Sequence, residues 1–320
     1  MSKKWRVVFL GTPQFAEICL QQILKNPSLD VVGVVTQPDR PAGRKLELTP
    51  SPVKLLAVSK GLKVLTPQSV NRDPGVLDEI LSWKADIAVV VAFGQILSQR
   101  FLDGFPFGAV NVHASLLPRW RGAAPIQRSI EAGDTITGVA LQKMVKELDA
   151  GDVIGERSVT IDSQINSLQL HDLLAAESCH LLDQDLLKYL QGEVKPWAQD
   201  SSQVTYASKI DKAESLLDWK QPALKLHNKV RAFTWGPGTY TVYQGKKIKI
   251  HQTRCRFDGP SLQVGQVQVQ GSELFVGTSE GVLEILELQP ESKKRMKTQE
   301  FLTGNTLRSG DFFETPENRT

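Results

Sequence analysis

The sequence predicts an α/β protein: a doubly wound, mostly parallel sheet followed by a smaller C-terminal β domain. Four runs in the first half are almost continuously apolar and rich in β-branched residues, at 5–11, 30–36, 86–94 and 108–114. Such runs are typical of parallel strands that are covered on both faces. Helix-like segments alternate with them, while the last hundred residues instead alternate in period two. In a doubly wound sheet, ligands bind beyond the carboxyl ends of the strands.

The helices of the first domain are predicted from periodicity and from their starting residues. They are expected over 13–25, 51–60, 75–83 and about 124–132, and Ser51 with Pro52 forms an N-cap and first position for the second of them. Two further strands are expected within 137–145 and 151–161. Leucines at helical spacing then predict a long helix over roughly 167–191.

The C-terminal part is predicted to be a small antiparallel barrel of the OB type. Residues 191–208 are polar, contain Gly, Pro and Ser, and show no sustained period, as expected of a linker. After it, 240–254, 263–270 and 273–290 alternate in period two between Gly-containing turns. We therefore expect a first domain over 1–190, a linker over 191–208 and a second domain over 209–320.

Composition places the chain among ordinary globular proteins of a reducing compartment. It has 320 residues, 41% of them hydrophobic and 23% charged, and its three cysteines are far apart with no metal-ligand spacing. No run approaches the roughly 18 apolar residues of a membrane span, and the apolar run at the N-terminus is too short for a signal peptide. We expect a cytoplasmic protein with no structural metal and no membrane association.

The positive charge of the chain lies in its C-terminal third. Residues 209–320 hold 17 Lys and Arg against 13 Asp and Glu, whereas the formal net charge of the whole chain is +3. This asymmetry is compatible with a polyanionic partner, and equally with an ordinary solvated surface.

Nucleotide-cofactor binding is not expected at the first turn. FLGTPQFA follows the first strand with a single glycine, so the Gly-x-Gly-x-x-Gly signature is absent. A helix N-terminus at this place can still hold an anion or a polar group.

Asn111 and His113 are the first candidate catalytic residues. They stand two residues apart at the end of a predicted strand, so both side chains lie on one face. An amide beside an imidazole can polarise a carbonyl and stabilise an oxyanion, although a buried, hydrogen-bonded strand end explains the pair as well. Asp149 could orient water, accept a proton or stabilise a charged His113; it could also form a turn, and Asp152 competes for the same role.

The sequence resembles the 10-formyltetrahydrofolate-dependent formyltransferases, and within them the enzymes that act on transfer RNA. The resemblance is carried by FLGTPQFA, VVTQPDRPAGRKLELTPSPVK, VVAFGQILS, NVHASLLPRWRGAAPIQRSI and LDAGDVI, in this order. It runs over the whole chain and is strongest from 5 to 155. It implies a transferase that moves a formyl group from 10-formyltetrahydrofolate to methionyl initiator transfer RNA, with folate as a co-substrate and no tightly bound cofactor.

The resemblance also implies roles for particular residues. Asn111 and His113 would polarise the formyl carbonyl, and Asp149 would position water and assist proton removal from the amine. The folate site would be bordered by two loops, with the residues Phe93, Gly94, Gln95, Ile96, Leu97, Ser115, Leu116, Leu117 and Pro118.

The transfer RNA contacts are expected in a long loop and on the second domain. The loop between the second strand and its helix is far longer than usual, and its candidates are Arg40, Arg44 and Lys45. In the second domain the candidates are Lys246, Lys247, Lys293, Lys294 and Arg295. Arg119 and Arg121 either anchor the RNA end or brace the turn that contains them. We expect a monomer.

Two other functions compete with this one. The first is a formyltransferase whose acceptor is an amino sugar or another small amine, and the second is a non-catalytic RNA-binding protein with a degenerate folate site. The long loop argues against the first, and the complete Asn111, His113 and Asp149 set argues against the second.

Overall fold

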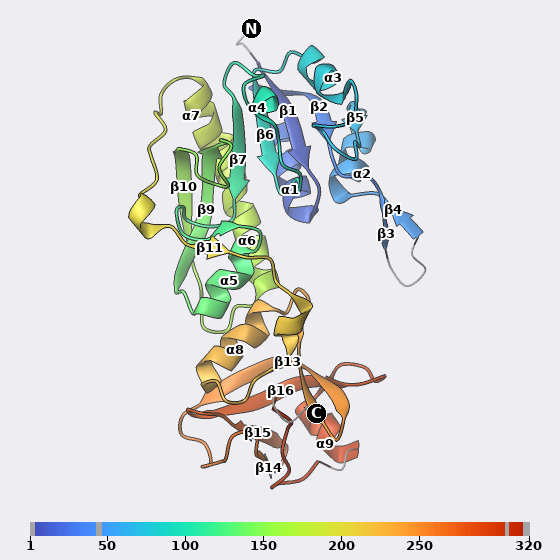
Figure 1. Cartoon of the computed structure of the whole chain (residues 1–320), viewed down its shortest axis with the longest axis vertical. Coiled ribbons are helices and arrows are strands. Elements are labelled where there is room, and N and C mark those ends of the chain that lie inside the picture. Colours follow the sequence, from blue (N-terminus) through green and yellow to red (C-terminus); the bar gives the residue numbers. More distant parts are fainter. Residues whose placement is uncertain (1–3, 43–46, 305–306, 316–320) are drawn as a thin grey trace. The chain divides into compact units, whose positions relative to one another are not determined.

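The chain folds into two compact units (Figure 1), and the computed structural model describes residues 4–42, 47–304 and 307–315. The first unit takes in Met1–Pro125, Ile136–Thr160 and His171–Ala207, and the second takes in Ile126–Thr135, Ile161–Leu170 and Ser208–Thr320. Two short segments from the middle of the sequence thus cluster with the C-terminal part. The predicted division at 191–208 stays a prediction.

The first unit is built on a seven-stranded sheet with the order β10-β9-β7-β6-β1-β2-β5. The five strands from β7 to β5 are parallel, and β9 and β10 are antiparallel to their neighbours. The mostly parallel sheet is confirmed. Its strands are β1 (Trp5–Gly11), β2 (Leu29–Val35), β5 (Val64–Leu65), β6 (Ile87–Val91), β7 (Ala109–His113), β9 (Ile136–Lys143) and β10 (Val153–Thr160).

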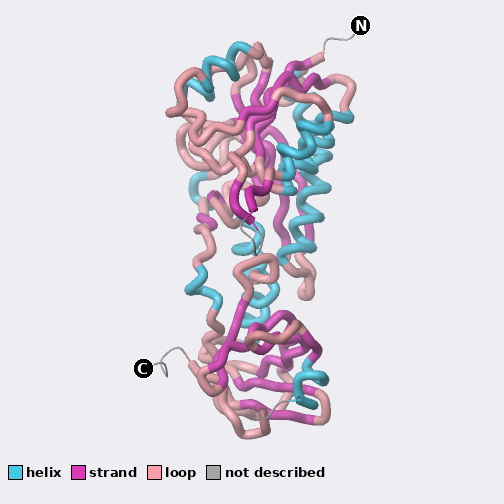
Figure 2. The backbone as a smooth tube through the Cα atoms, turned by 90° about the vertical axis from the view of Figure 1, so that its right-hand side faces the viewer, coloured by secondary structure: helices cyan, strands magenta, loops and turns pink. Residues whose placement is uncertain are grey.

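Both faces of the central strands are buried, as the apolar runs predict. Val8 and Leu10 of β1 share a core cluster with Trp83 and Phe101, and Val7 and Phe9, which alternate with them along the strand, are also fully buried. In Figure 2 the strands of this unit form a layer with helices on either side. Trp83 lies flat against Gly33 of β2, where an added Cβ would stand 2.2 Å from the ring, so this contact requires glycine.

The helices of this part of the chain follow the predicted segments closely, except for the short α4, which was not predicted. They are α1 (Gln14–Lys25), α2 (Pro52–Ser59), α3 (Val76–Ser82), α4 (Gln99–Leu102), α5 (Pro125–Ala132), α6 (Ser167–His180), a π-helical turn η1 (Leu181–Asp185) and α7 (Leu186–Leu190). The hydroxyl of Ser51 accepts a hydrogen bond from the Lys54 amide at 3.1 Å, so the predicted N-cap is confirmed. The predicted long helix is continuous from α6 through η1 to α7.

The loops beyond the carboxyl ends of β1, β2 and β6 are tied to one another. The carbonyl oxygen of Phe93 accepts hydrogen bonds from the Thr12 hydroxyl at 3.2 Å and the Gln37 side-chain amide at 3.0 Å. The long loop after β2 contains a hairpin, β3 (Arg40–Ala42) with β4 (Glu47–Thr49), that the sequence did not predict.

The second unit contains an antiparallel sheet with the order β12-β13-β16-β15-β14, and β17 pairs with β16. Its strands are β12 (Thr239–Tyr243), β13 (Lys246–Arg256), β14 (Val267–Gln270), β15 (Glu273–Gly277), β16 (Val282–Pro290) and β17 (Met296–Lys297). The predicted antiparallel domain is confirmed, whereas its closure into an OB-type barrel stays a prediction.

Helix α8 (Ala223–Ala232) packs on this sheet and was not predicted. The core beneath it includes Trp219, whose ring nitrogen donates to the Thr241 hydroxyl at 3.0 Å. The remaining elements of the chain are β8 (Arg121–Gly122), β11 (Tyr206–Ala207), the 3-10 turns η2 (Ser201–Gln203) and η3 (Lys212–Ser215), and α9 (Thr298–Gly304). In the described ranges, no helix combines the length and the apolar character needed to cross a membrane.

Candidate functional site

Asn111 and His113 lie on the same face at the carboxyl end of β7, as their spacing predicts. The antiparallel register places Gln142 of β9 directly opposite Asn111. Gln142 is almost completely buried and directly follows the apolar residues Val139 to Leu141. It was not predicted from the sequence, although an amide that follows an apolar strand run is a recognisable signal of a buried polar site.

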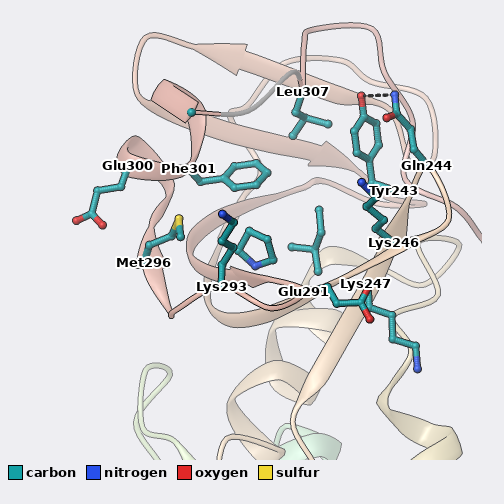
Figure 3. A pocket seen from close by; sticks show the side chains of 13 residues that line it. Tyr243, Gln244, Lys246, Lys247, Glu291, Lys293, Met296, Glu300, Phe301 and Leu307 are labelled. Carbon is teal, nitrogen blue, oxygen red and sulfur yellow. Dashed lines mark hydrogen bonds between the residues drawn. The ribbon is translucent and has the colours of Figure 1, made fainter.

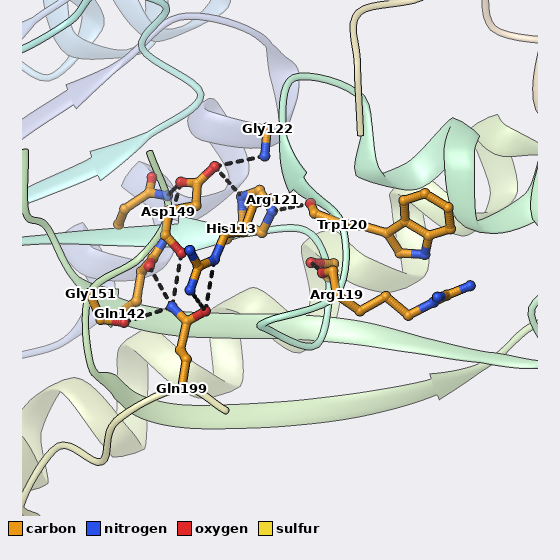
Figure 4. A network of polar contacts seen from close by, with 11 residues as sticks. His113, Arg119, Trp120, Arg121, Gly122, Gln142, Asp149, Gly151 and Gln199 are labelled. Carbon is orange, nitrogen blue, oxygen red and sulfur yellow. Dashed lines mark hydrogen bonds and ion pairs between the residues drawn. The ribbon is translucent and has the colours of Figure 1, made fainter. Parts of the chain in front are cut away.

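Asp149 meets this face through both of its carboxylate oxygens (Figure 4). Its Oδ1 accepts from the side-chain amides of Gln142 at 3.0 Å and Asn111 at 3.5 Å, and its Oδ2 accepts from the Gly122 amide at 2.9 Å. The structure therefore brings together the three predicted catalytic residues, which are separated by up to 38 positions in the chain.

Asp149 and Asp152, the two competing carboxylates, differ in position. The side chain of Asp149 is mostly buried among these donors, whereas Asp152 is exposed. The carbonyl oxygen of Asp152 instead accepts a backbone hydrogen bond from Lys143 at 2.8 Å. Asp149 adopts a left-handed backbone conformation with a φ of 49°, which Asp tolerates better than most residues.

The ring of His113 is held at one nitrogen and faces a carboxylate at the other. Nε2 lies 2.8 Å from the carbonyl oxygen of Trp120, and since a carbonyl can only accept, this nitrogen carries a proton. Nδ1 lies 3.7 Å from Oδ2 of Asp149, an ion-pair distance once the ring is protonated. A protonated ring would therefore present its second N–H beside Asp149, in a site where only 7% of the imidazole is exposed.

Arg121 and Arg119 differ in their surroundings. Arg121 is buried, and its guanidinium donates from Nε and Nη2 to Oε1 of Gln199 at 3.1 and 2.8 Å. Arg121 thus braces the turn, one of the two roles that the sequence left open. Arg119 is exposed, and its guanidinium stacks 4.4 Å from the centre of the Trp120 ring.

The turn over Ser115 to Pro118 is packed against the sheet. Ser115 is fully buried, and its hydroxyl donates to the carbonyl oxygen of Arg119 at 2.6 Å. Leu117 packs with Ala140 and Val153 in a small core cluster. Leu116 is half-buried beside Gly138, and the Leu117–Pro118 peptide bond is cis.

The second predicted folate loop, residues 93–97, alternates between buried and exposed side chains. Phe93 and Leu97 belong to the core cluster of the first unit, while Ile96 is 89% exposed. Gln95 fixes the loop, because its Oε1 accepts from the Val70 amide at 2.8 Å and its Nε2 donates to the Pro67 carbonyl at 3.2 Å.

A cavity of about 440 Å³ opens beside this loop, beyond the carboxyl ends of β1, β2 and β6. Apolar and proline side chains make up most of its wall, and Phe93, Gly94 and Arg40 line it together. Arg40 is exposed and donates to Oε1 of Gln37 at 3.2 Å. Arg44 and Lys45 lie outside the described residues.

In the second unit, Lys246, Lys247 and Lys293 line one pocket of about 410 Å³ (Figure 3). Apolar side chains, among them Phe301 and Leu307, also line it.

The other two predicted cations of the second unit, Lys294 and Arg295, lie on the same turn and are both exposed. Arg295 forms an ion pair with Glu287, which offsets its charge.

Within the described ranges, no group of three or more His, Cys, Asp or Glu side chains is placed to hold a metal ion. All three cysteines are free thiols, and burial raises the pKa of each, that of Cys255 to about 11. Since the thiolate is the nucleophilic form, none of these cysteines is suited to covalent catalysis.

Comparison with known protein families matches both parts of the chain. Residues 5–184 match the family described as "Formyl transferase". Residues 209–306 match "Formyl transferase, C-terminal domain".

Three curated relatives are similar over nearly their whole length, and each is named methionyl-tRNA formyltransferase. The protein of Bdellovibrio bacteriovorus is 55% identical over 312 residues, covering 96% of this chain and 98% of the relative. The protein of Bacillus velezensis is 40% identical, covering 96% of each chain. That of Symbiobacterium thermophilum is 41% identical, covering 98% of this chain and 96% of the relative.

Solved structures share the fold at low sequence identity. An N-formyltransferase from Helicobacter canadensis, in complex with folinic acid and dTDP-3-aminofucose, superposes with a TM-score of 0.67 at 18% identity, covering 89% of this chain and 99% of that one. The HypX protein of Aquifex aeolicus, in complex with tetrahydrofolic acid, superposes with a TM-score of 0.59 at 18% identity, covering 98% of this chain and 51% of that one.

Proposed function

The chain belongs to the formyl transferase family, and from this premise we propose that it transfers a formyl group to the amino group of methionyl-tRNA. The observation that carries the proposal is the similarity to methionyl-tRNA formyltransferases over nearly the whole of both chains. The N-formyltransferase solved with dTDP-3-aminofucose also spans most of this chain, but at only 18% identity, whereas the methionyl-tRNA formyltransferases are 40 to 55% identical.

The proposed donor is 10-formyltetrahydrofolate, consumed as a co-substrate, and the proposed acceptor is initiator methionyl-tRNA. The donor fits the family, since formyl transfer needs an activated formyl group. The acceptor is that of the curated relatives. Because formylmethionyl-tRNA is used to begin translation, we place the activity in the cytoplasm, and we propose that the monomer is active.

The proposed chemistry is acyl transfer through a tetrahedral intermediate. The methionyl nitrogen attacks the formyl carbon, and the carbonyl electron pair moves onto the formyl oxygen. Collapse of the intermediate breaks the bond to N10 of the folate, which leaves as tetrahydrofolate after taking up a proton. The attacking nitrogen loses one proton, so the overall proton count is unchanged.

The reaction assigns different roles to Asn111, His113 and Asp149. The Asn111 amide and Nδ1 of His113 both lie beside Asp149, where the amide can donate to the oxyanion and the imidazole can do so when it is protonated. Asp149 lies beside them as a carboxylate with two oxygens held by neutral donors, so it can stabilise the charged imidazole and accept the proton of the amine through water.

The folate is proposed to lie along the two predicted folate loops, residues 93–97 and 115–118, at the carboxyl ends of the parallel strands. The exposed Ile96 offers an apolar surface, and the loop of Phe93 to Leu97 offers backbone groups beside the cavity. The turn of Ser115 to Pro118 begins two residues after His113, so a folate bound along it would lie beside the catalytic residues. Both loops follow the carboxyl ends of parallel strands, which is where doubly wound folds bind their ligands.

The RNA end is proposed to enter from the loop after β2. Arg40 lines the same cavity as Phe93 and Gly94, which brings a predicted RNA contact to a predicted folate loop. Arg44 and Lys45 follow in the same loop. Lys246, Lys247, Lys293, Lys294 and Arg295 would contact phosphates elsewhere on the RNA.

The proposed function is tested by offering different acceptors with one donor. We expect formyl transfer from 10-formyltetrahydrofolate to initiator methionyl-tRNA, and little transfer to amino sugars or free methionine at equal concentration. Transfer confined to the small amines would refute the proposed acceptor. RNA binding with no transfer to any acceptor would instead favour a non-catalytic RNA-binding protein.

The lysine pocket gives a prediction about salt dependence. Changing Lys246, Lys247 and Lys293 together to Gln should weaken RNA binding and reduce the slope of log affinity against log salt by about one unit per lysine. The KM for the folate should stay within about twofold. Measuring the dissociation constant for RNA at several salt concentrations, from about 50 to about 200 mM, tests this prediction. Lys60→Gln, an exposed lysine after α2, is the control, and an equal slope in the wild type and the triple variant would contradict the assignment.

A further inference from the structure

The segment between α7 and η3 lies along the catalytic site and is attached beside it by backbone hydrogen bonds at two places. Trp197 exchanges two backbone hydrogen bonds with Val153, at 2.8 and 2.9 Å. Further on, β11 pairs with β8 in parallel, with Tyr206 opposite Arg121 and Ala207 opposite Gly122. Gln199 lies between these two attachments, so its position is fixed from both sides.

The side chain of Gln199 closes a bridge between the Asp149 turn and Arg121 (Figure 4). Its Nε2 donates to the carbonyl oxygens of Asp149 at 2.8 Å and Gly151 at 2.7 Å. Its Oε1 accepts from Nε and Nη2 of Arg121. Both ends of the amide are therefore used, and they cannot be exchanged, since carbonyls only accept and a guanidinium only donates.

The turn that Gln199 holds has little freedom to move elsewhere. Asp149 has a left-handed backbone conformation, and an added Cβ on Gly151 would stand 1.8 Å from the carbonyl oxygen of Lys143. The turn is thus pressed against the end of β9 on one side and tied to Gln199 on the other. Gly122, the neighbour of Arg121, binds the carboxylate of Asp149 directly.

We infer that Gln199 is a positioning residue for Asp149 in the formyl transfer, acting with the buried Arg121. The inference rests on the proposed function. Gln199 holds the backbone of Asp149, while Gln142, Asn111 and the Gly122 amide hold its carboxylate. The segment that joins the two predicted domains thus contributes to the catalytic site. A displacement of the carboxylate by about 1 Å would cost roughly 100-fold in rate.

The test uses Gln199→Ala and Gln199→Glu in the full chain. The Ala variant loses every contact, and the Glu variant keeps the acceptor for Arg121 but cannot donate to Asp149 and Gly151. We expect kcat to fall roughly 10- to 100-fold in both, with the KM for folate and for methionyl-tRNA unchanged within about twofold. Gln203→Ala is the matched control, because Gln203 lies in the same segment, is exposed and binds only Asp200 among the described contacts.

A double-mutant cycle separates positioning from general support of the fold. If Gln199 acts through Asp149, adding Gln199→Ala to Asp149→Asn should cost less than about twofold more. Full additivity of the two losses would overturn the inference, as would unchanged kcat in both single variants or a loss confined to KM. A wild-type chain that fails to formylate methionyl-tRNA would refute the proposed function instead, so the two failures are distinguishable.

Discussion

Changing Asp149 to Asn is expected to lower kcat/KM for formyl transfer by about 1,000-fold, within the usual range for losing a general base. Asn tolerates the left-handed backbone conformation of this residue, so the turn should keep its shape. The amide, however, cannot accept a proton. It also places an NH₂ group against the Gly122 amide or against the side-chain amides of Gln142 and Asn111, which are all donors.

The affinity of this variant for methionyl-tRNA should be nearly unchanged, because Asp149 is mostly buried and its oxygens are bound by groups of the protein. The matched control is Asp152→Asn, an exposed carboxylate three residues further on. Single-turnover transfer and RNA binding, measured on the same preparations, check the prediction. Wild-type rates in Asp149→Asn, or an equal loss in Asp152→Asn, would remove Asp149 from the mechanism.

Changing His113 to Gln should lower kcat by about 100- to 1,000-fold while KM for both substrates stays nearly constant. Gln can still donate a neutral hydrogen bond, but unlike an imidazole it cannot accept a proton beside Asp149. An interaction made with the oxyanion exists only in the transition state, so its loss lowers kcat and kcat/KM together.

This second prediction is checked by steady-state kinetics with saturating folate and RNA. His180→Gln is the control, since His180 is exposed at the end of α6. A rise in KM with kcat preserved would mean that His113 contributes to binding and not to the chemical step.

The first domain was predictable from sequence because its central strands are buried on both faces. Residues 7–10 of β1 and 87–91 of β6 are continuously apolar, as is typical of parallel strands that are covered on both faces. Helix α8 escaped prediction because His227, Asn228 and Arg231 interrupt its apolar period. They are nevertheless buried, since Arg231 donates to the carbonyls of Asp162 and Ile165, a pairing that only the tertiary structure supplies.

The candidate site was predictable only in part. Asn111 and His113 stand two residues apart, so their common face follows from strand geometry alone. The approach of Asp149 depends on β9 returning antiparallel beside β7, which no local pattern encodes. Gln199 was missed for the same reason, because its partner Asp149 is 50 residues away in the sequence.

The central claim is that the formyl group reacts where Asn111, His113 and Asp149 converge. A crystal structure with a non-reactive analogue of the donor that carries its formyl group on N10 tests it most directly. We predict the formyl oxygen within about 3.2 Å of the Asn111 amide nitrogen or of Nδ1 of His113, with Asp149 within reach directly or through one water. A folate bound with its formyl group beyond hydrogen-bond distance of all three residues would contradict the account.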